Sequence, residues 1–222
     1  MRTPRVTTFL LIALTSVMVS LGACRDDTPT SPNGSIELAK ASNPDSAKRS
    51  LTAQLNQERK RLKRLADSTR AQFDSANREW AEYKKHHKGP LTGALVTLLR
   101  CQPQPYSGDA EIIGPAGGTI HFGRNSLVIP KGALSQPTVI TGEQPIGSLV
   151  QAQFSPHGLQ FNESATLTIS YEHCYVPTSQ ENLIVYIGWG HQLLEFEPSK
   201  DDKAAKAVQA LIDHFSGYAV AY

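Results

Sequence analysis

Several residue types are scarce in this chain. It contains three cysteines and two tryptophans among 222 residues, and its formal net charge is only +2. A nearly neutral charge gives no reason to expect a nucleic-acid partner. After an initial apolar run, residues 25–32 hold no second one, and the first run alone is shorter than the roughly 20 residues of a membrane span. Glycine and proline are both absent from residues 45–88, which indicates a long regular element there.

The first 24 residues have the order of parts found in a secretion signal. Arg2 and Arg5 supply positive charge, residues 9–19 are mostly apolar, and small residues lead to Cys24. The Leu-Gly-Ala-Cys sequence at residues 21–24 resembles the lipobox of bacterial lipoproteins. That resemblance implies that a signal peptide over residues 1–23 is removed and that Cys24 carries a thioether-linked diacylglycerol.

The lipobox implies a location as well as a modification. The mature chain would belong to the bacterial cell envelope, anchored by the lipid on Cys24, with the outer membrane as the expected residence and the periplasm or the surface as the side it faces. An ordinary secreted protein cleaved near Ala23 is the alternative. Both readings place the mature protein outside the cytoplasm.

The cysteine count then leaves one pair. If Cys24 carries lipid, Cys101 and Cys174 remain, and an oxidising compartment favours their joining. Such a disulfide would close a long loop and stabilise the domain in the chain-entropy model. Two buried free thiols are the alternative.

A flexible tether and a long helix are expected next. Residues 24–43 are rich in proline and poor in large apolar side chains, as in a linker. Asn43 and Pro44 are typical of a helix start, and the sequence predicts a basic helix over residues 44–88. Its apolar residues form a heptad-like stripe: Leu55, Leu62, Ala66, Phe73, Ala76, Trp80 and Tyr83.

Two features decide what this helix is expected to do. Arg59 and Thr69 interrupt the stripe, so we expect a helix that self-associates weakly or folds back on the rest of the chain, rather than a strong coiled coil.

Residues 45–88 hold twelve Lys and Arg against six Asp and Glu, whereas residues 89–222 hold six against eleven. The basic arm could contact anionic lipid or cell-wall polymer, and a solvated helix face is the plainer interpretation.

The remaining chain changes to a strand pattern. Residues 89–105 are expected to form a connector, with an amphipathic helix over 90–100. Beyond it, short β-rich runs separated by turn residues predict an antiparallel sandwich or barrel over residues 106–222. The expected runs are 110–113, 118–122, 126–129, 138–141, 149–154, 165–171, 183–189 and 193–196. Residues 203–215 fit a helix or a strand, and we expect a strand from about Ala207.

Five ordered motifs in this region resemble the ZU-five domain of ankyrins, netrin receptors and zonula-occludens proteins. The resemblance implies a β-sandwich that acts mainly as a protein-interaction module. The motifs lie at residues 117–119, 127–134, 155–161, 165–168 and 214–220.

The motif at residues 214–220 also allows an alternative function, self-cleavage of the chain. Some ZU-five members cleave themselves within a His-Phe-Ser sequence, and that resemblance would place a break between Phe215 and Ser216, with Ser216 as nucleophile and His214 as base. Such an acyl shift needs strain and a positioned base. Since only seven residues follow the break, we expect Phe215 to close the sandwich instead, with His214 and Ser216 at the start of its last strand.

No metal site or cofactor is expected from the sequence. His173 and Cys174 are the closest pair of metal-ligand types, but neighbouring strand residues point to opposite faces. The sequence therefore predicts a non-enzymatic envelope protein that holds an unidentified envelope protein or cell-wall polymer near the membrane. An autoproteolytic module and a structural spacer that oligomerises through its helix are the alternatives.

Overall fold

The computed structural model describes residues 44–86 and 97–222. Cys24, the signal peptide and the tether lie outside the described residues. Two helices are seen, α1 (Pro44–Ser68) and α2 (Arg70–His86). The described strands are β1 (Arg100–Gln104), β2 (Ser107–Ile113), β3 (Gly118–Phe122), β4 (Asn125–Ile129), β5 (Thr138–Gln144), β6 (Gly147–Leu149), β7 (Gln151–Ser155), β8 (Gln160–Ser170), β9 (Leu183–Ile187), β10 (Leu193–Phe196), β11 (Ser199–Asp202), β12 (Ala207–His214) and β13 (Gly217–Ala221).

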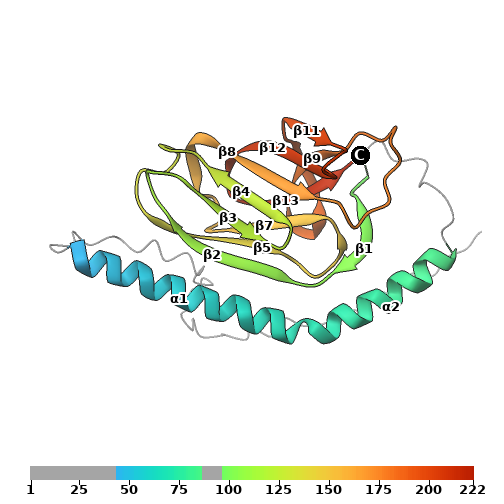
Figure 1. The fold of residues 1–222 in the computed structure, drawn as a ribbon, viewed down its shortest axis with the longest axis horizontal. Coiled ribbons are helices and arrows are strands. Elements are labelled where there is room, and N and C mark those ends of the chain that lie inside the picture. Colours follow the sequence, from blue (N-terminus) through green and yellow to red (C-terminus); the bar gives the residue numbers. More distant parts are fainter. Residues whose placement is uncertain (1–43, 87–96) are drawn as a thin grey trace, which may run out of the picture. The chain divides into compact units, whose positions relative to one another are not determined.

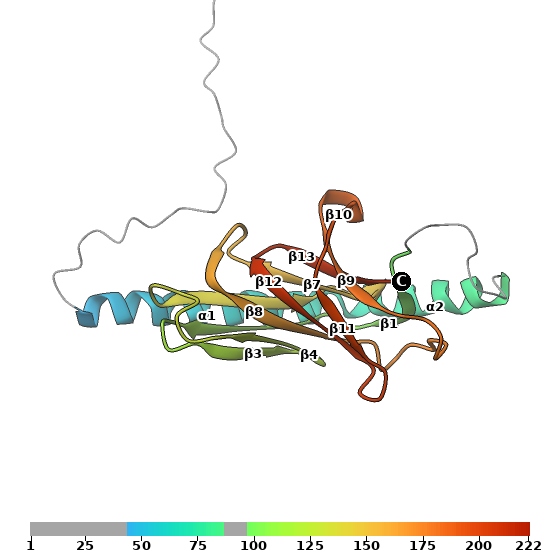
Figure 2. The same cartoon turned by 90° about the horizontal axis from the view of Figure 1, so that it is seen from above.

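The strands form two main antiparallel sheets, which Figures 1 and 2 show, and a short ribbon. One sheet has the order β10-β9-β13-β7-β5-β2, and the other has the order β11-β12-β8-β4-β3. Strands β1 and β6 pair as a separate two-stranded ribbon. The predicted mainly β fold with antiparallel sheets, preceded by helix, is confirmed.

Alternating side chains explain why the sheets pack on each other. In β8, Ala165, Leu167 and Ile169 are fully buried while the residues between them are partly exposed. Strand β12 alternates in the same way, with Val208, Ala210 and Ile212 buried. A period of two places one face of each strand in the core. The ambiguous segment is therefore a strand from Ala207, as predicted.

An aromatic cluster occupies the core between the sheets. The ring of Phe154 stacks on Phe215 with centroids 5.2 Å apart, and it meets Phe122 edge-on at 5.4 Å. Phe161 meets the other side of Phe215 at 4.9 Å. Stacked and edge-on pairs at these distances add to the stabilisation from burial.

The predicted helix starts at Pro44 and is divided at Thr69. The Thr69 hydroxyl donates a hydrogen bond to the Leu65 carbonyl at 2.7 Å, and the Thr69 N–H donates to the same carbonyl at 2.9 Å. A threonine hydroxyl that bonds back by four residues competes with the helical ladder and bends the helix. Neither described helix has the length and hydropathy of a membrane span.

Helix α1 packs along the sandwich edge instead of standing free (Figure 1). Leu62 is 3% exposed, and its Cδ2 atom would lie 3.2 Å from a Cβ added to Gly108 on β2. Around it, Arg61 forms an ion pair with Glu143 of β5 at 2.6 Å. Of the two arrangements expected for the helix, the fold-back is seen for α1.

The prediction of a helix over residues 90–100 is wrong for residues 97–100, the part of this range that the structure describes. Leu98 bridges Ala221, and Arg100 begins β1. The Leu99 N–H donates to the Val220 carbonyl at 2.7 Å, and the Leu99 carbonyl accepts from Val150 at 3.0 Å. Because Val220 and Val150 satisfy the backbone groups of Leu99, Leu98 and Leu99 are extended here despite the helical spacing of the sequence.

Candidate functional site

The disulfide between Cys101 and Cys174 is confirmed. It joins β1 to the loop after β8, across a sequence separation of 73 residues and a Cα–Cα distance of 5.1 Å. A ring nitrogen of His173 lies within 4.8 Å of both sulfurs. Since the sulfurs are bonded to each other, they offer no thiolate ligands. Burial and, to a smaller extent, the charge of Arg124 lower the pKa of His173.

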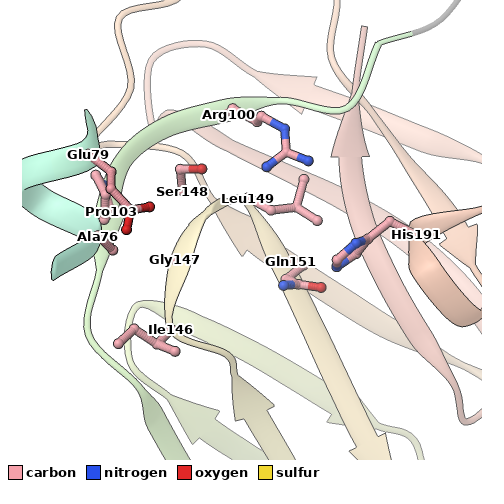
Figure 3. Close-up of a pocket in the computed structure, with 10 residues that line it drawn as sticks. All are labelled: Ala76, Glu79, Arg100, Pro103, Ile146, Gly147, Ser148, Leu149, Gln151 and His191. Carbon is pink, nitrogen blue, oxygen red and sulfur yellow. The ribbon is translucent and has the colours of Figure 1, made fainter. Parts of the chain in front are cut away.

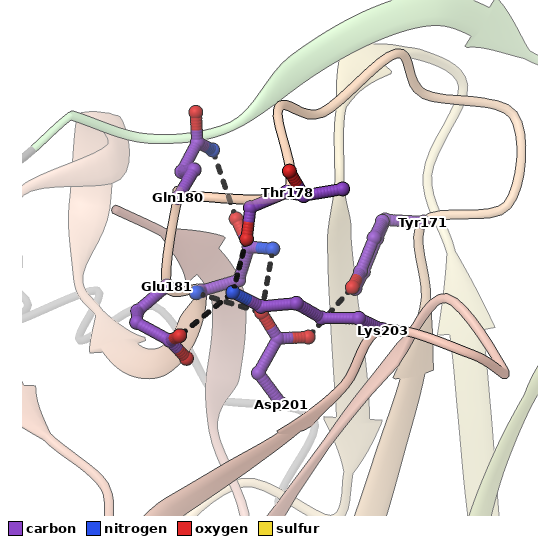
Figure 4. Close-up of polar contacts among 7 residues, drawn as sticks. Tyr171, Thr178, Gln180, Glu181, Asp201 and Lys203 are labelled. Atoms are coloured by element: carbon purple, nitrogen blue, oxygen red, sulfur yellow. Dashed lines mark hydrogen bonds and ion pairs between the residues drawn. The ribbon is translucent and has the colours of Figure 1, made fainter.

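The loop that carries Cys174 is also held by a polar cluster, drawn in Figure 4. One carboxylate oxygen of Asp201 accepts from the Tyr171 hydroxyl at 2.6 Å, and the other accepts from both nitrogens of Asn182 at 3.0 and 2.9 Å. Lys203 donates to Glu181 at 2.7 Å. Burial and the bond to Asp201 raise the pKa of Tyr171 to about 12. The loop is thus fixed at both ends.

The His214-Phe215-Ser216 sequence forms the connection between β12 and β13. Phe215 is 1% exposed, its N–H donates to the Leu159 carbonyl at 2.9 Å, and its carbonyl accepts from Gly158 at 3.0 Å. The Ser216 carbonyl accepts from Phe154 at 3.1 Å. Both backbone groups of Phe215 are therefore engaged in the closure of the sandwich.

The two reactive side chains of this motif are not joined. The His214 ring lies edge-on to the Tyr186 ring at 5.0 Å, and its backbone carbonyl accepts from the Tyr218 hydroxyl at 2.6 Å. Among the described residues, no hydrogen bond links His214 to Ser216. Strand β13, which follows, lies between β9 and β7 rather than at an edge.

A cavity of about 540 Å³ opens on the outer face of the six-stranded sheet. Figure 3 shows its walls, which come from α2, β1, β6, β7 and the single-turn 3-10 helix η1 (Trp189–His191). The polar side chains that line it are Glu79, Arg100, Ser148, Gln151 and His191. Ile146 and Leu149 add apolar surface.

Gln151 is the unusual residue of this cavity. It is 7% exposed, and its Oε1 atom is buried without a hydrogen-bond partner in the described structure. Strand alternation points its side chain away from the core, on the same face as its cross-strand partner Ala219. A buried polar atom without a partner costs free energy, so its retention calls for an explanation.

His191 enters the cavity from a turn with unusual backbone geometry. Gly190 and His191 both have positive φ values, 66° and 63°. Glycine adopts this region at no steric cost, whereas histidine does so only occasionally. The turn is closed by a hydrogen bond from the Gly188 N–H to the Gln192 carbonyl at 2.8 Å. It presents the imidazole beside β7.

Sequence reasoning singled out Cys101, Cys174, His214 and Ser216 but missed Arg100 and Gln151. The available signal was weak: Arg100 is one of two arginines after residue 88. No local pattern could bring it next to Gln151 and His191, because these three residues lie far apart along the chain. Their assembly depends on the pairing of β1 with β6.

Comparison with known proteins adds no assignment. A scan against protein-family models finds no match for this chain, and a search of curated proteins finds none either. The likeness to the ZU-five domain and to the lipobox therefore stays a prediction from the sequence.

Proposed function

We propose that the protein is a lipid-anchored component of the bacterial cell envelope whose β-sandwich binds a partner without catalysing a reaction. The lipobox ending at Cys24 supports the anchor. The observation that favours binding over self-cleavage is the arrangement of the motif at residues 214–216, because among the described residues no hydrogen bond joins His214 to Ser216. Acyl transfer needs a base positioned to take the proton of the nucleophile, and the His214 ring packs against Tyr186 instead.

The arrangement of helix and sandwich fits this role. Lipid on Cys24 would hold the N-terminus at the membrane, the tether would give reach, and α1 would keep the sandwich attached through Leu62 and its neighbouring arginines. The sheets would then present their outer surfaces to an envelope protein or to cell-wall polymer.

The anchor is tested by the Cys24→Ala variant. Cells labelled with a clickable fatty acid should yield labelled wild-type protein in the membrane fraction, and unlabelled variant in the soluble fraction. A double Cys101→Ala, Cys174→Ala variant is the matched control, because it removes two thiols and keeps the lipid site. A Cys24→Ala protein that stays in the membrane without label would contradict the anchor.

The partner is sought by cross-linking in intact cells followed by mass spectrometry. Recovery of one envelope protein with cross-links to residues 106–222 supports the binding module. Cross-links confined to residues 45–88, together with self-association of the purified protein in sedimentation, would favour the structural spacer.

Self-cleavage has its own readout. A cleaved chain would lose residues 216–222 under denaturing conditions, and Ser216→Ala would restore the intact mass. We expect the intact mass in both proteins, since the two side chains of the motif are not in contact through a hydrogen bond.

A further inference from the structure

We infer that the cavity lined by Arg100, Gln151 and His191 is a binding site for a short peptide segment with a free C-terminal carboxylate. This site goes beyond the proposed anchoring role and does not depend on it. Figure 3 shows these three side chains projecting into one space from β1, β7 and η1. Arg100 and Gln151 supply the two polar parts of the recognition.

Arg100 supplies the anion contact. It is exposed at the start of β1, and within the described parts of the chain no carboxylate forms an ion pair with it. The other arginines at the sandwich sheets, Arg59, Arg61 and Arg124, are paired with acidic residues. A guanidinium binds a carboxylate through two parallel hydrogen bonds, which gives both strength and direction.

Gln151 supplies the independent evidence for a ligand. The residue is more than nine-tenths buried, and its Oε1 acceptor has no hydrogen-bond partner in the described structure. A peptide carries N–H and C=O groups next to its terminal carboxylate, so it can satisfy either end of a glutamine amide.

The rest of the lining favours a peptide over other ligands. Ile146 and Leu149 can take an apolar side chain, and Glu79 of α2 can take an ammonium or a second N–H. A divalent cation would need several carboxylates, and Glu79 is the one acidic residue of the lining. The cavity volume of about 540 Å³ lies within the usual range of sites for small ligands.

The test uses purified full-length protein and two tripeptide libraries of the same sequences. One library has free C-termini and the other has C-terminal amides. Native mass spectrometry should detect complexes with members of the first library, and the matching amides should bind about 10- to 100-fold more weakly, the loss expected for a charged hydrogen bond. Arg100→Met should cause the same loss. Arg78→Met, which removes an exposed arginine of α2 outside the lining, should bind like wild type.

Gln151→Leu separates a binding role from a structural one. It replaces an unsatisfied amide with an apolar group of similar size, so the free protein should be as stable as wild type or more stable. Peptide affinity should nevertheless fall about tenfold. If Gln151 had only a structural role, its replacement would not lower peptide affinity while stability is kept.

Three outcomes would overturn the site: no tripeptide binds, the amides bind as well as the acids, or Arg100→Met retains wild-type affinity. Each of them leaves the fractionation result for Cys24→Ala unchanged. Failure of the cavity and failure of the anchor are therefore distinguishable.

Discussion

Phe154 in the sandwich and Leu62 in α1 are both almost fully buried, but their surroundings differ. Phe154 is enclosed by the rings of Phe122, Phe215 and Tyr218. Leu62 is the buried residue of its helix, and charged side chains surround it. The sandwich is thus stabilised mainly by apolar packing, whereas α1 is attached by one buried leucine, by partly buried leucines and by several ion pairs. The two regions should respond differently to mutation, salt and pH.

The largest effect is expected in the sandwich core. Phe154→Ala should lower the free energy of unfolding by about 3–5 kcal/mol, because it leaves a cavity between three aromatic rings. Urea denaturation followed by circular dichroism measures the change. Phe196→Ala is the matched control, since Phe196 is 50% exposed and its loss should cost less than about 0.5 kcal/mol. Equal effects from the two variants would contradict the assigned core.

The disulfide is expected to rank next. Replacing both Cys101 and Cys174 with alanine should cost about 2–4 kcal/mol, because the unfolded chain regains the freedom of a loop of 73 residues. The same loss should appear in wild-type protein after reduction. A cost under about 1 kcal/mol would contradict this account of the unfolded chain.

The sequence predicted the positions of single helices and strands better than it predicted how the strands pair. The run at residues 118–122 matches β3, and the helix begins at Pro44 as predicted, because turn residues and a helix cap act locally. Local patterns do not specify which strands pair. Strand β13 lies between β9 and β7, although its sequence suggested only a last strand.

The candidate cavity could not be predicted for the same reason. Its lining combines residues from α2, the β1–β6 ribbon, β7 and η1, and its unsatisfied atom on Gln151 exists only because these segments cover the sheet face. Helical spacing in residues 90–100 also predicted the wrong conformation at Arg100. Backbone bonds from Leu99 to two distant strands outweigh that spacing.

Loss of Leu62 should affect the helix more than the sandwich. Leu62→Ala should weaken the docking of α1 by about 2 kcal/mol, near the low end for buried leucines, because the contact lies at a surface. Trypsin cleavage within α1 should then accelerate, while the urea midpoint of the sandwich changes little. Leu51→Ala, at a partly exposed position of the same helix, is the control. Cleavage at the wild-type rate would show that the charges alone hold α1.

Alkaline pH tests the polar cluster beside the disulfide. Tyr171 has its pKa raised from 10.0 to about 12 in the folded protein, by burial and by the bond to Asp201. Its contribution is full below pH 10 and is lost as pH rises towards 12, since the unfolded chain releases this proton first. Between pH 9 and pH 11, wild type should lose about 1 kcal/mol more stability than Tyr171→Phe. Tyr175→Phe, 97% exposed, should follow wild type.

The smallest effect is expected from the ion pairs of α1. Arg61 pairs with Glu143 at 2.6 Å and with Glu58 at 2.7 Å, and Glu143 also accepts from the Tyr106 hydroxyl at 2.7 Å. Because Arg61 is 38% exposed, its replacement by glutamine should weaken docking by less than about 1 kcal/mol. The difference in α1 cleavage between Arg61→Gln and wild type should shrink as salt rises to about 1 M, because salt weakens the attraction between partly exposed charges. Cleavage of Leu62→Ala should stay fast at every salt concentration, because an apolar contact is not screened. If salt instead released α1 as completely as the loss of Leu62 does, the ion pairs would be the main attachment, and the contrast with the sandwich would be even greater.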